Sequence, residues 1–522
     1  MNYYRSVLLG GTLWVGLAHA QTDSVRMHYA NTISSNDLMR HLGVIASDAY
    51  EGREAGMKGQ KMAAEYLREQ FASFGIPAVP NAEALGLEQG YFQPFDLEVR
   101  RPGGIVVFHK ERPYRFMEGQ FYFNEKLNSD VKVNDLVVVA ERTMGPEPFS
   151  GLDLKGKVVL YLDSSEDPEV GGNVPAAEIM ARMSLFSGAA ERGGAVALLF
   201  STSSYDALRV NYAHYISSPR MQLARKAPAA ANIGTQVMLT GPELTDALLE
   251  AAGTDAKKAR RKARKARYVK NAPMEIAFRV SPLTSKLRSE NVLAYIEGSD
   301  KREELVVVTA HYDHIGKDNE DVYNGADDDG SGTVALLEMA EAFAKAKAEG
   351  NGPRRSVLFM PVSAEEKGLL GSEYYSEAPV FPLENTIADL NIDMIGRRDS
   401  AHASGPSYVY VIGSDRLSTE LHAINEEANT NYVSLDLDYT FNAKDDPNRF
   451  YYRSDHYNFA RKGVPSIFYF SGVHEDYHGP GDEVEKILPD LLEQRTRLVF
   501  YTAWELANRE QRIAVDRPEG SQ

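Results

Sequence analysis

The chain has 522 residues, and 43% of them are hydrophobic, which is enough to build sizeable cores in roughly two to four domains. Its formal net charge of −17 at pH 7 argues against general nucleic-acid binding, because such binding requires a positive field around the phosphates. The chain has no cysteine, which excludes disulfides and a cysteine-linked lipid anchor. Its stability must therefore come from the size of its cores or from bound metal.

The N-terminus has the features of an export signal. Arg5 precedes an apolar run over 7–17, and Ala18-His19-Ala20 forms an A-x-A cleavage site. The apolar run is shorter than the about 20 residues that a spanning helix needs, and no later stretch is long and apolar enough to span a membrane. We therefore predict a signal peptide over 1–20 and a mature protein that is secreted or periplasmic.

Helices are predicted first after the signal. From 35 to 75 apolar residues recur at helical spacing, Asn36-Asp37 can cap the first helix, and Gly75 suits the end of the second. From about 90 to 123 apolar and polar residues alternate, which is typical of strands.

Residues 119–278 have the pattern of a separate α/β domain. Short apolar strands are predicted over 135–141, 156–162 and 194–200, with a helix over 176–192. This block lacks the clustered carboxylates and histidines that occur later in the chain. We expect it to be an inserted domain without chemistry of its own.

A basic run lies near the end of this block, at 257–267, with the sequence KKARRKARKAR. Its alanines recur at helical spacing, so the run is predicted to be one helix with a thin alanine face. Such a run can be a patch for nucleic acid or for an anionic surface. We favour a solvated helix, because the rest of the chain is acidic.

After residue 279 apolar strands alternate with helices. Buried strands in this arrangement predict a doubly wound, mostly parallel sheet with helices on both faces, formed by 21–118 and 279–522 together. Strands are predicted at 292–298, 305–310, 356–363, 387–392, 408–413 and 464–472, and helices at 333–348, 418–428 and 488–508.

Three of these strands end at side chains that can bind a metal, and a fourth group lies in the loop Asp327-Asp328-Asp329. Ligands of open α/β sheets lie at the carboxyl ends of strands, and histidine with carboxylates suits zinc or another first-row divalent ion. Two ions sharing Asp328 would be balanced in charge by three carboxylates and one hydroxide. The five predicted ligands are His311, Asp328, Glu366, Asp393 and His478.

Three further residues have predicted roles beside these ligands. Glu365 precedes a ligand and can take a proton from a water and pass it to a leaving amine. Asp313 follows His311 by two residues and can orient that imidazole. Tyr477 is either a donor to a developing oxyanion or an ordinary packing residue.

Two motifs resemble other catalytic sets. His474 to His478 matches H-E-x-x-H, which binds zinc only on a helix, but Gly479-Pro480-Gly481 follows it and breaks helices. We therefore take His478 alone as a ligand and place His474 and Glu475 at the surface or rim. Ser454-Asp455-His456 contains the residue types of a Ser-His-Asp triad, but adjacent residues cannot easily form that geometry, so 454–456 is predicted to be structural. The neighbouring segment 451–453 is a candidate wall of the substrate pocket.

The motifs TAHYDH, GADDDGSG, AEEKGLLGS, NIDMIG, SDHYNFARKGVPS and DYHGPGD, in this order, resemble the co-catalytic zinc exopeptidases of metallopeptidase family 28. The resemblance covers about 35–115 and 280–510, and the central block resembles the protease-associated domain that is inserted in many members. The family implies domains at 1–20 (signal), 21–118 and 279–522 (catalytic, zinc exopeptidase-like) and 119–278 (inserted).

By motif, the five predicted ligands match the family's metal ligands, with Asp328 as the bridging ligand and Glu365 as the general base. Tyr477 matches a position that contacts the transition state in some members, and a cis peptide is implied after Asp328. The resemblance implies two Zn²⁺ ions and hydrolysis of the N-terminal peptide bond of peptides by a metal-bridged hydroxide. A carboxypeptidase on the same site and a glutaminyl-cyclase-like transferase with one zinc are the alternatives.

Overall fold

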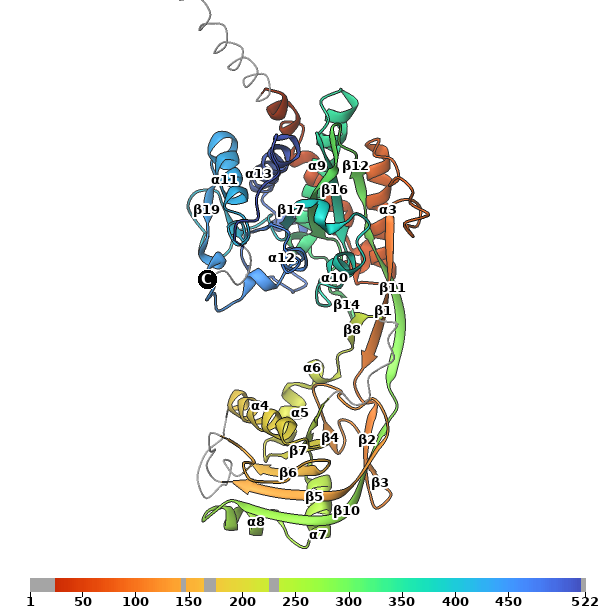
Figure 1. Cartoon of the computed structure of the whole chain (residues 1–522), viewed down its shortest axis with the longest axis vertical. Helices are drawn as coiled ribbons and strands as arrows, with labels where there is room; N and C mark the ends of the chain where they lie inside the picture. Colours follow the sequence, from red (N-terminus) through yellow and green to blue (C-terminus); the bar gives the residue numbers. More distant parts are fainter. Residues whose placement is uncertain (1–23, 142–146, 164–174, 225–233, 518–522) are drawn as a thin grey trace, which may run out of the picture. The chain divides into compact units, whose positions relative to one another are not determined.

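The computed structural model describes residues 24–141, 147–163, 175–224 and 234–517, so the predicted signal peptide lies outside the described residues. Across these ranges, no helix combines the length and the apolar character that crossing a membrane requires. The chain forms two compact units (Figure 1). Unit 1 comprises the chain up to residue 97 and from 287 onward, and unit 2 comprises 98–286.

Unit 1 contains a seven-stranded sheet in the order β12-β16-β13-β17-β20-β18-β19. Four of the six strand pairs are parallel, and β12 and β18 run antiparallel to β16 and β20. The predicted mostly parallel sheet is therefore confirmed. The strands are β12 Ala294–Ile296, β13 Lys301–His311, β16 Arg355–Val362, β17 Thr386–Ile392, β18 Tyr408–Ile412, β19 Asp436–Asp438 and β20 Ser466–Phe470.

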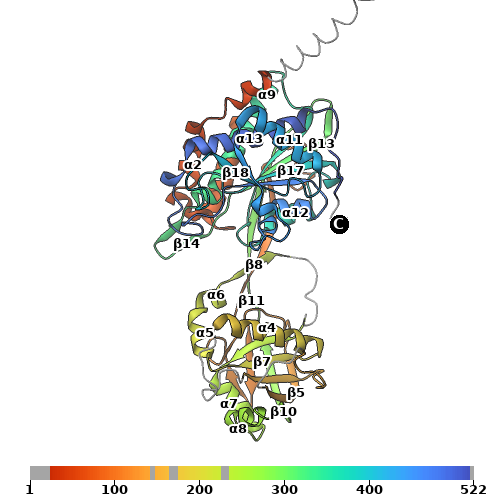
Figure 2. The ribbon, with the colours of Figure 1, turned by 90° about the vertical axis from the view of Figure 1, so that its left-hand side faces the viewer.

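Helices cover both faces of this sheet, because successive side chains of a strand point to opposite faces. Val306 and Val308 of β13 pack in the core with the first helix layer, and Leu305 and Val307 pack with the second. Figure 2 shows α11 and α13 on one side of β17 and β18, and α12 on the other. The first layer is α2 Ser35–Ile45, α3 Lys58–Ser73, α9 Gly332–Ala348, α11 Thr419–Ala428 and α13 Pro489–Asn508, and the second is α10 Leu370–Glu377 and α12 His456–Ala460.

The cap of α2 lies two residues before the predicted cap, Asn36-Asp37. Ser34 caps the helix, since its hydroxyl accepts a hydrogen bond from the backbone N–H of Asp37, so Asn36 and Asp37 lie inside the helix. The end of α3 agrees with the prediction. The helix stops at Ser73, and Gly75 has a φ of 81°, which glycine adopts without strain.

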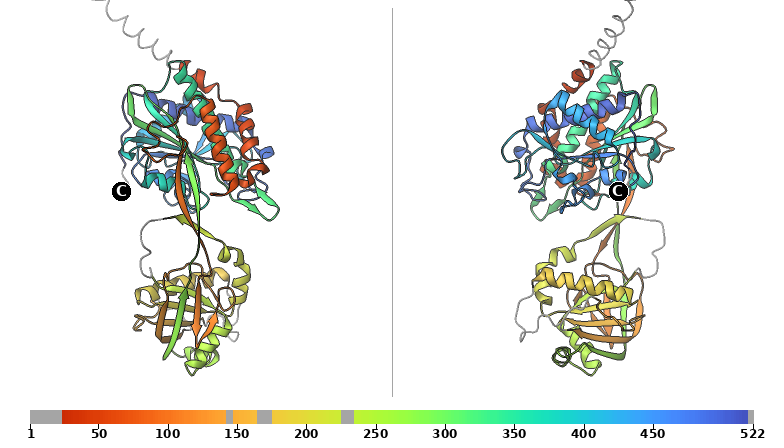
Figure 3. Two further views of the ribbon diagram at one scale, coloured as in Figure 1. Left: turned by 90° about the vertical axis from the view of Figure 1, so that its right-hand side faces the viewer. Right: turned by 60° about the vertical axis from the view of Figure 1, so that its left-hand side comes forward.

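Unit 2 contains an eight-stranded sheet in the order β3-β2-β10-β5-β6-β7-β9-β4, in which β5, β6, β7 and β9 are parallel. Its helices also lie on both faces, with α4 on one side and α7 and α8 on the other (Figure 3). The strands are β2 Ile105–His109, β3 Arg112–Tyr114, β4 Gln120–Phe121, β5 Val131–Glu141, β6 Val158–Asp163, β7 Ala197–Ser201, β9 Gln236–Thr240 and β10 Tyr268–Val280. The helices are α4 Ala176–Arg192, α5 Tyr205–Asn211, α6 Ala213–Ser217, α7 Pro242–Ala251 and α8 Ala256–Ala263.

Unit 2 is larger than the predicted inserted segment, 119–278. The hairpin of β2 and β3 pairs with β10 through β2, so residues 98–118 belong to unit 2 and not to unit 1. The chain passes between the units in β1 (Phe92–Arg101) and β11 (Leu283–Val292). The alternation of apolar and polar residues over 98–118 did not show which strand this segment pairs with.

Candidate metal centre

The candidate centre lies at the carboxyl ends of three neighbouring strands of unit 1. β13 ends at His311, Glu365 and Glu366 follow β16, and Asp393 follows β17. β16 and β17 flank β13 on opposite sides, so the chain reverses its direction of winding there. In open α/β sheets such a reversal opens the crevice in which ligands bind.

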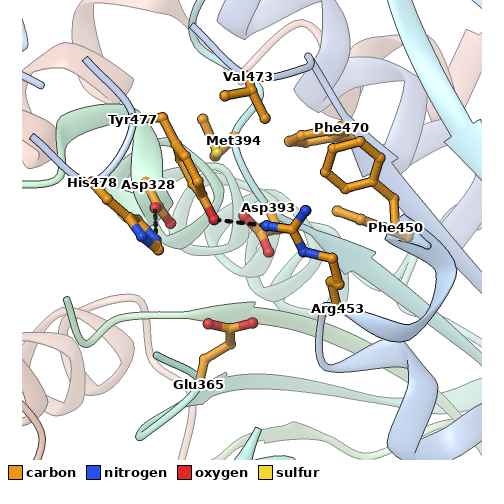
Figure 4. A pocket seen from close by; sticks show the side chains of 11 residues that line it. Asp328, Glu365, Asp393, Met394, Phe450, Arg453, Phe470, Val473, Tyr477 and His478 are labelled. Atoms are coloured by element: carbon orange, nitrogen blue, oxygen red, sulfur yellow. Dashed lines mark hydrogen bonds and ion pairs between the residues drawn. The ribbon is translucent and has the colours of Figure 1, made fainter. Parts of the chain in front are cut away.

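The five predicted ligands converge on Asp328. Its Oδ1 lies 3.1 Å from Nε2 of His311, and its Oδ2 lies 3.2 Å from Nε2 of His478. Asp393 Oδ1 is 3.7 Å from the same His311 nitrogen, and Glu366 Oε2 is 3.1 Å from the same His478 nitrogen. The residues therefore form two groups that share Asp328, and Figure 4 shows His478 and Asp393 on either side of it.

The loop that presents Asp328 is fixed by the aspartates on either side of it. The bond between Asp328 and Asp329 is cis, as the family resemblance implies. Asp329 accepts hydrogen bonds from three backbone N–H groups, those of His311, Gly332 and Met394, at 2.9–3.2 Å. These contacts tie the loop to β13 and to the end of β17, so the neighbouring carboxylate is held at the strand ends.

Asp482 fixes the same loop from the other side. Its carboxylate accepts hydrogen bonds from the backbone N–H groups of Asp327 and Asp328 at 3.0–3.1 Å. Asp327 in turn accepts one from the N–H of Gly396 at 2.6 Å. Three aspartates thus serve the backbone, and Asp328 is the one of the four that faces His311 and His478.

Two triads of side chains have ligand atoms close enough together to hold an ion, namely His311, Asp329 and Asp393, and His314, Asp328 and Glu366. In the first triad, Asp329 already accepts three backbone hydrogen bonds. Asp328 Oδ1 lies 3.1 Å from His311 and so suits that ion better. The geometry favours Asp328 as a ligand shared by both groups.

The site has a surplus of buried negative charge. Its five carboxyl side chains are at most 10% exposed. Buried charges need charged or hydrogen-bonding partners, yet Asp328 Oδ2 and Glu366 Oε1 make no well-aligned hydrogen bond, although nitrogens of His478 and His314 lie 3.2 and 2.7 Å away. Divalent cations would satisfy these oxygens, so the residues present fit a metal centre. The five carboxyl groups belong to Asp313, Asp328, Glu365, Glu366 and Asp393.

The pKa values show the same crowding. Burial raises the pKa of Glu365 well above its ordinary value, and the charges of Asp393 and Asp455 raise it further, against the opposite effect of His311. Burial likewise raises the pKa of Asp313 to about 6 and that of Asp455 to about 7. Several carboxylates therefore lack the positive charge that would stabilise their ionised forms.

Arg53 is the buried cation beneath the site, and sequence reasoning missed it. It is fully buried, and its guanidinium donates hydrogen bonds to four backbone carbonyls at 2.6–3.0 Å. Burial lowers its pKa to about 10, although the nearby aspartates raise it. Arg53 thus ties the end of β13 to the loop before Asp328. The four carbonyls belong to Ile45, Tyr312, Asn324 and Gly325.

Asp313 contacts the His311 imidazole through its backbone carbonyl and not through its carboxylate. The ring N–H at Nδ1 of His311 donates to the backbone carbonyl of Asp313 at 3.0 Å, which turns Nε2 toward Asp328. The Asp313 carboxylate instead accepts a hydrogen bond from the backbone N–H of Glu365 at 3.1 Å. Asp313 therefore orients both His311 and the segment that presents Glu365.

A pocket opens on the centre and is lined by Glu365, Asp328, Asp393, Tyr477 and mainly apolar side chains (Figure 4). Arg453 donates a hydrogen bond to the Tyr477 hydroxyl at 3.3 Å, which leaves the hydroxyl proton free to donate elsewhere. The predicted wall segment 451–453 contributes Arg453, while Tyr451 is buried in the core behind it. The apolar lining consists of Met394, Phe450, Phe468, Phe470 and Val473.

Ser454 supports the centre from the predicted structural segment 454–456. Its hydroxyl donates to Asp393 Oδ2 at 2.6 Å and accepts from the side-chain amide of Asn391 at 2.8 Å. Ser454 thus orients one predicted ligand. Asp455 and His456 are fully buried, and no contact places them with Ser454 in a catalytic triad.

The segment from His474 to His478 is a turn and not a helix, so the helical zinc motif is excluded as predicted. The placement of His474 at the surface was wrong. His474 is buried, its Nε2 lies 3.4 Å from Asp327 Oδ2, and its other nitrogen contacts Arg397 at 3.0 Å. Only Glu475 of this pair is exposed. The residue spacing could not show that the chain folds His474 back beneath the loop.

His314 was missed by sequence reasoning and belongs to the centre. It is fully buried, and its Nδ1 lies 2.7 Å from Glu366 Oε1 and 4.0 Å from Asp328 Oδ2. Gly325 makes room for this ring, since a Cβ there would lie 2.5 Å from its Cγ. The motif TAHYDH contains this histidine three residues after His311. Its ring faces Glu366, in the group of His478, and not the group of His311.

The comparisons with known proteins agree with this geometry. Residues 291–503, which contain all five predicted ligands, match the profile of peptidase family M28. The match confirms, for this part of the chain, the resemblance that the motifs predict.

Two similar proteins have names that state an activity. A probable leucine aminopeptidase of Arthroderma otae is 31% identical over 229 residues, which are 42% of this chain and 59% of that protein. The aminopeptidase YwaD of Bacillus subtilis is 27% identical over 232 residues, which are 43% of this chain and 46% of that protein. The chain thus spans about half of each of these relatives.

A solved structure, the aminopeptidase from Aneurinibacillus sp. strain AM-1, resembles the whole chain. The similarity covers 94% of this chain and 98% of the other, with a TM-score of 0.52 and 19% sequence identity. It shows that the two proteins share a fold.

Proposed function

We propose that this protein is a zinc-dependent aminopeptidase that removes the N-terminal residue of peptides. The observation that carries the proposal is the pair of carboxylate–histidine groups that share Asp328, next to a carboxylate that belongs to neither group, Glu365. The aminopeptidase names of the relatives support the same activity.

Five residues would hold two zinc ions in this proposal. His311 and Asp393 would bind one ion, Glu366 and His478 would bind the other, and Asp328 would bind both. Aspartate, glutamate and histidine are the oxygen and nitrogen ligands that zinc takes in catalytic sites. Paired zinc ions lower the pKa of bound water and polarise a carbonyl group.

Glu365 moves the proton. Its carboxylate takes a proton from the attacking water as the oxygen forms its bond to the scissile carbonyl carbon, and it gives the proton to the amine nitrogen as the C–N bond breaks. The hydrogen bond from the backbone N–H of Glu365 to the carboxylate of Asp313 holds the Glu365 side chain at the pocket. Its negative charge also favours a substrate with a protonated N-terminal amine over one with a terminal carboxylate.

Tyr477 acts on the carbonyl oxygen. Its hydroxyl faces the pocket and donates a hydrogen bond as negative charge develops on that oxygen. Arg453 directs the hydroxyl by donating to its oxygen atom. The apolar side chains of the pocket receive the side chain of the N-terminal residue and keep bulk water from it.

We also propose that the protein acts after export and that unit 2 is a protease-associated domain. The export signal is supported by the composition of residues 1–20. The domain assignment is supported by the separate fold of 98–286 and by the chain's resemblance to family members with an insertion at this point.

The test uses the purified protein with zinc and two peptides of the same sequence, one with a free N-terminus and one N-acetylated. Mass spectrometry identifies the products, and we expect stepwise loss of N-terminal residues from the free peptide only. Trimming of both peptides from the C-terminus would instead show a carboxypeptidase. Loss of ammonia from a peptide that begins with glutamine, without cleavage, would show a cyclase.

A further inference from the structure

Helix α8 of unit 2 and the turn after it present an unusual density of positive charge. Residues 257–267 contain eight lysines and arginines and no acidic residue. Asp255 caps the helix by accepting a hydrogen bond from the N–H of Lys258, and Ala259 and Ala263 are buried in the core of unit 2. Because the alanines face inward, the basic side chains face solvent.

This arrangement works against the stability of the helix itself. Lys257 and Arg261, and Lys258 and Lys262, are like charges four residues apart, which destabilise a helix. Lys257 and Lys258 also lie in the first turn, where the helix dipole disfavours positive charge. Local choices that oppose the fold are expected at functional sites.

Most of the charge is not neutralised within the protein. Arg267 pairs with Glu141 at 2.6 Å, and Lys262 lies over the ring of Tyr268. Four other cations are exposed and have no ion pair with any residue that the structure describes, namely Lys257, Lys258, Arg261 and Lys265. They form a positive patch on a chain whose net charge is −17.

We propose that this patch, Lys257, Lys258, Arg261 and Lys265, docks the protein on an anionic phospholipid surface. The proposal goes beyond the peptidase function and does not depend on it. Clusters of lysine and arginine on a surface helix bind anionic headgroups through charge alone. Insertion into the bilayer is not available to α8, since its apolar face is already part of the core.

The same residues do not suit nucleic acid. Arginine and lysine can contact guanine, but reading a mixed base sequence also requires side chains such as asparagine and glutamine, and single strands are held by aromatic stacking. The run 257–267 contains only lysine, arginine and alanine. Tyr268, the aromatic residue that follows, is half-buried and donates its hydroxyl to Thr254. The patch can therefore attract negative charge, but it lacks the side chains that read adenine or stack on bases.

The test measures co-sedimentation of the full protein with vesicles of phosphatidylcholine alone and with equimolar phosphatidylglycerol. The variant K257Q/K258Q/R261Q/K265Q is compared with the control K110Q/R115Q/K155Q/K286Q, which removes the same charges from other exposed positions of unit 2. Circular dichroism and peptidase turnover check that both variants keep their fold and activity.

We expect the protein to bind the anionic vesicles at low salt, to ignore phosphatidylcholine and to be released by added salt. The patch variant should lose roughly 10²- to 10³-fold in partitioning, while the control should lose much less. Equal losses in the two variants, or no binding by the wild type, would overturn the proposal. So would tighter binding to duplex DNA at the same salt, or release by inorganic phosphate at constant ionic strength.

Discussion

The two units place acidic side chains at the same position in their sheets, the carboxyl ends of parallel strands, but treat them differently. In unit 2, Glu141 and Asp163 end neighbouring strands, in register. Each has its own guanidinium, Arg267 at 2.6 Å and Arg182 at 2.8 Å. In unit 1 the acids at this edge face histidines and one another.

We call the carboxyl ends of the parallel strands in unit 2 the closed edge and those in unit 1 the open edge. In unit 2 the folded chain supplies the positive charge for its buried carboxylates. In unit 1 the buried guanidinium of Arg53 is occupied by four backbone carbonyls, and the carboxylates of Asp328 and Glu366 face histidine nitrogens in place of a guanidinium. Position at a strand end is therefore not enough to indicate a metal site. Among the described residues, the lack of a lysine or arginine ion pair at these carboxylates is the more informative feature.

The largest expected effect comes from removing the proton carrier at the open edge. Glu365→Gln should lower kcat by about 10²- to 10⁴-fold, because the amide cannot accept the proton from water. Zinc content should stay at the wild-type value, since Glu365 is not one of the five predicted ligands. Steady-state kinetics with metal analysis of the same sample measures both quantities. Turnover close to that of the wild type would refute the role of Glu365.

The next effect is on the closed edge. Arg182→Met leaves the fully buried carboxylate of Asp163 without this guanidinium and should destabilise unit 2 by about 3–5 kcal/mol. Urea unfolding measures the loss, and zinc content should not change. Lys132→Met removes one partner of an exposed pair with Glu275 and serves as the control, with little expected effect. A lower zinc content in the Arg182 variant would contradict the separation of the two edges.

A smaller effect is expected at His314. In our account its ring, 2.7 Å from Glu366 Oε1, keeps that carboxylate turned toward His478. His314→Gln should weaken binding of one of the two zinc ions by about 10- to 100-fold, as measured by competition with a chelator. His41→Gln, at another fully buried histidine of unit 1, should leave both affinities unchanged. Equal affinities in the His314 variant and the wild type would remove His314 from the centre.

The smallest effect is expected at Ser454. Ser454→Ala removes the hydrogen bond to Asp393. It should weaken binding of the zinc ion that Asp393 and His311 would hold by about tenfold. The matched control is Ser466→Ala, a buried serine of unit 1 whose hydroxyl donates to a backbone carbonyl. The same chelator titration compares the two variants. A loss in both, or in neither, would mean that Ser454 does not orient Asp393.

The sequence predicted the layout of unit 1 because the information is local. A strand that ends at His311 or before Asp393 is visible as an apolar run followed by a polar side chain, and parallel strands bring such ends together. The helix α4 was likewise predicted at its observed bounds, Ala176–Arg192. Three of the residues proposed to hold zinc, His311, Glu366 and Asp393, lie at such strand ends.

What the sequence did not reveal depends on contacts between distant segments. His474 lies beneath the loop of Asp327, more than a hundred residues earlier in the chain, and Ser454 reaches Asp393 from another element. The start of unit 2 depends on the pairing of β2 with β10. Residue type and spacing do not fix such pairings, because several arrangements satisfy the same local pattern.

The most direct test of the central claim is a zinc count on dialysed protein, comparing the wild type with Asp328→Ala at the open edge and Asp163→Ala at the closed edge. We predict two tightly bound ions per chain in the wild type and in the Asp163 variant, and fewer in the Asp328 variant. Fewer than two ions in the wild type, or the same count in all three proteins, would contradict the account.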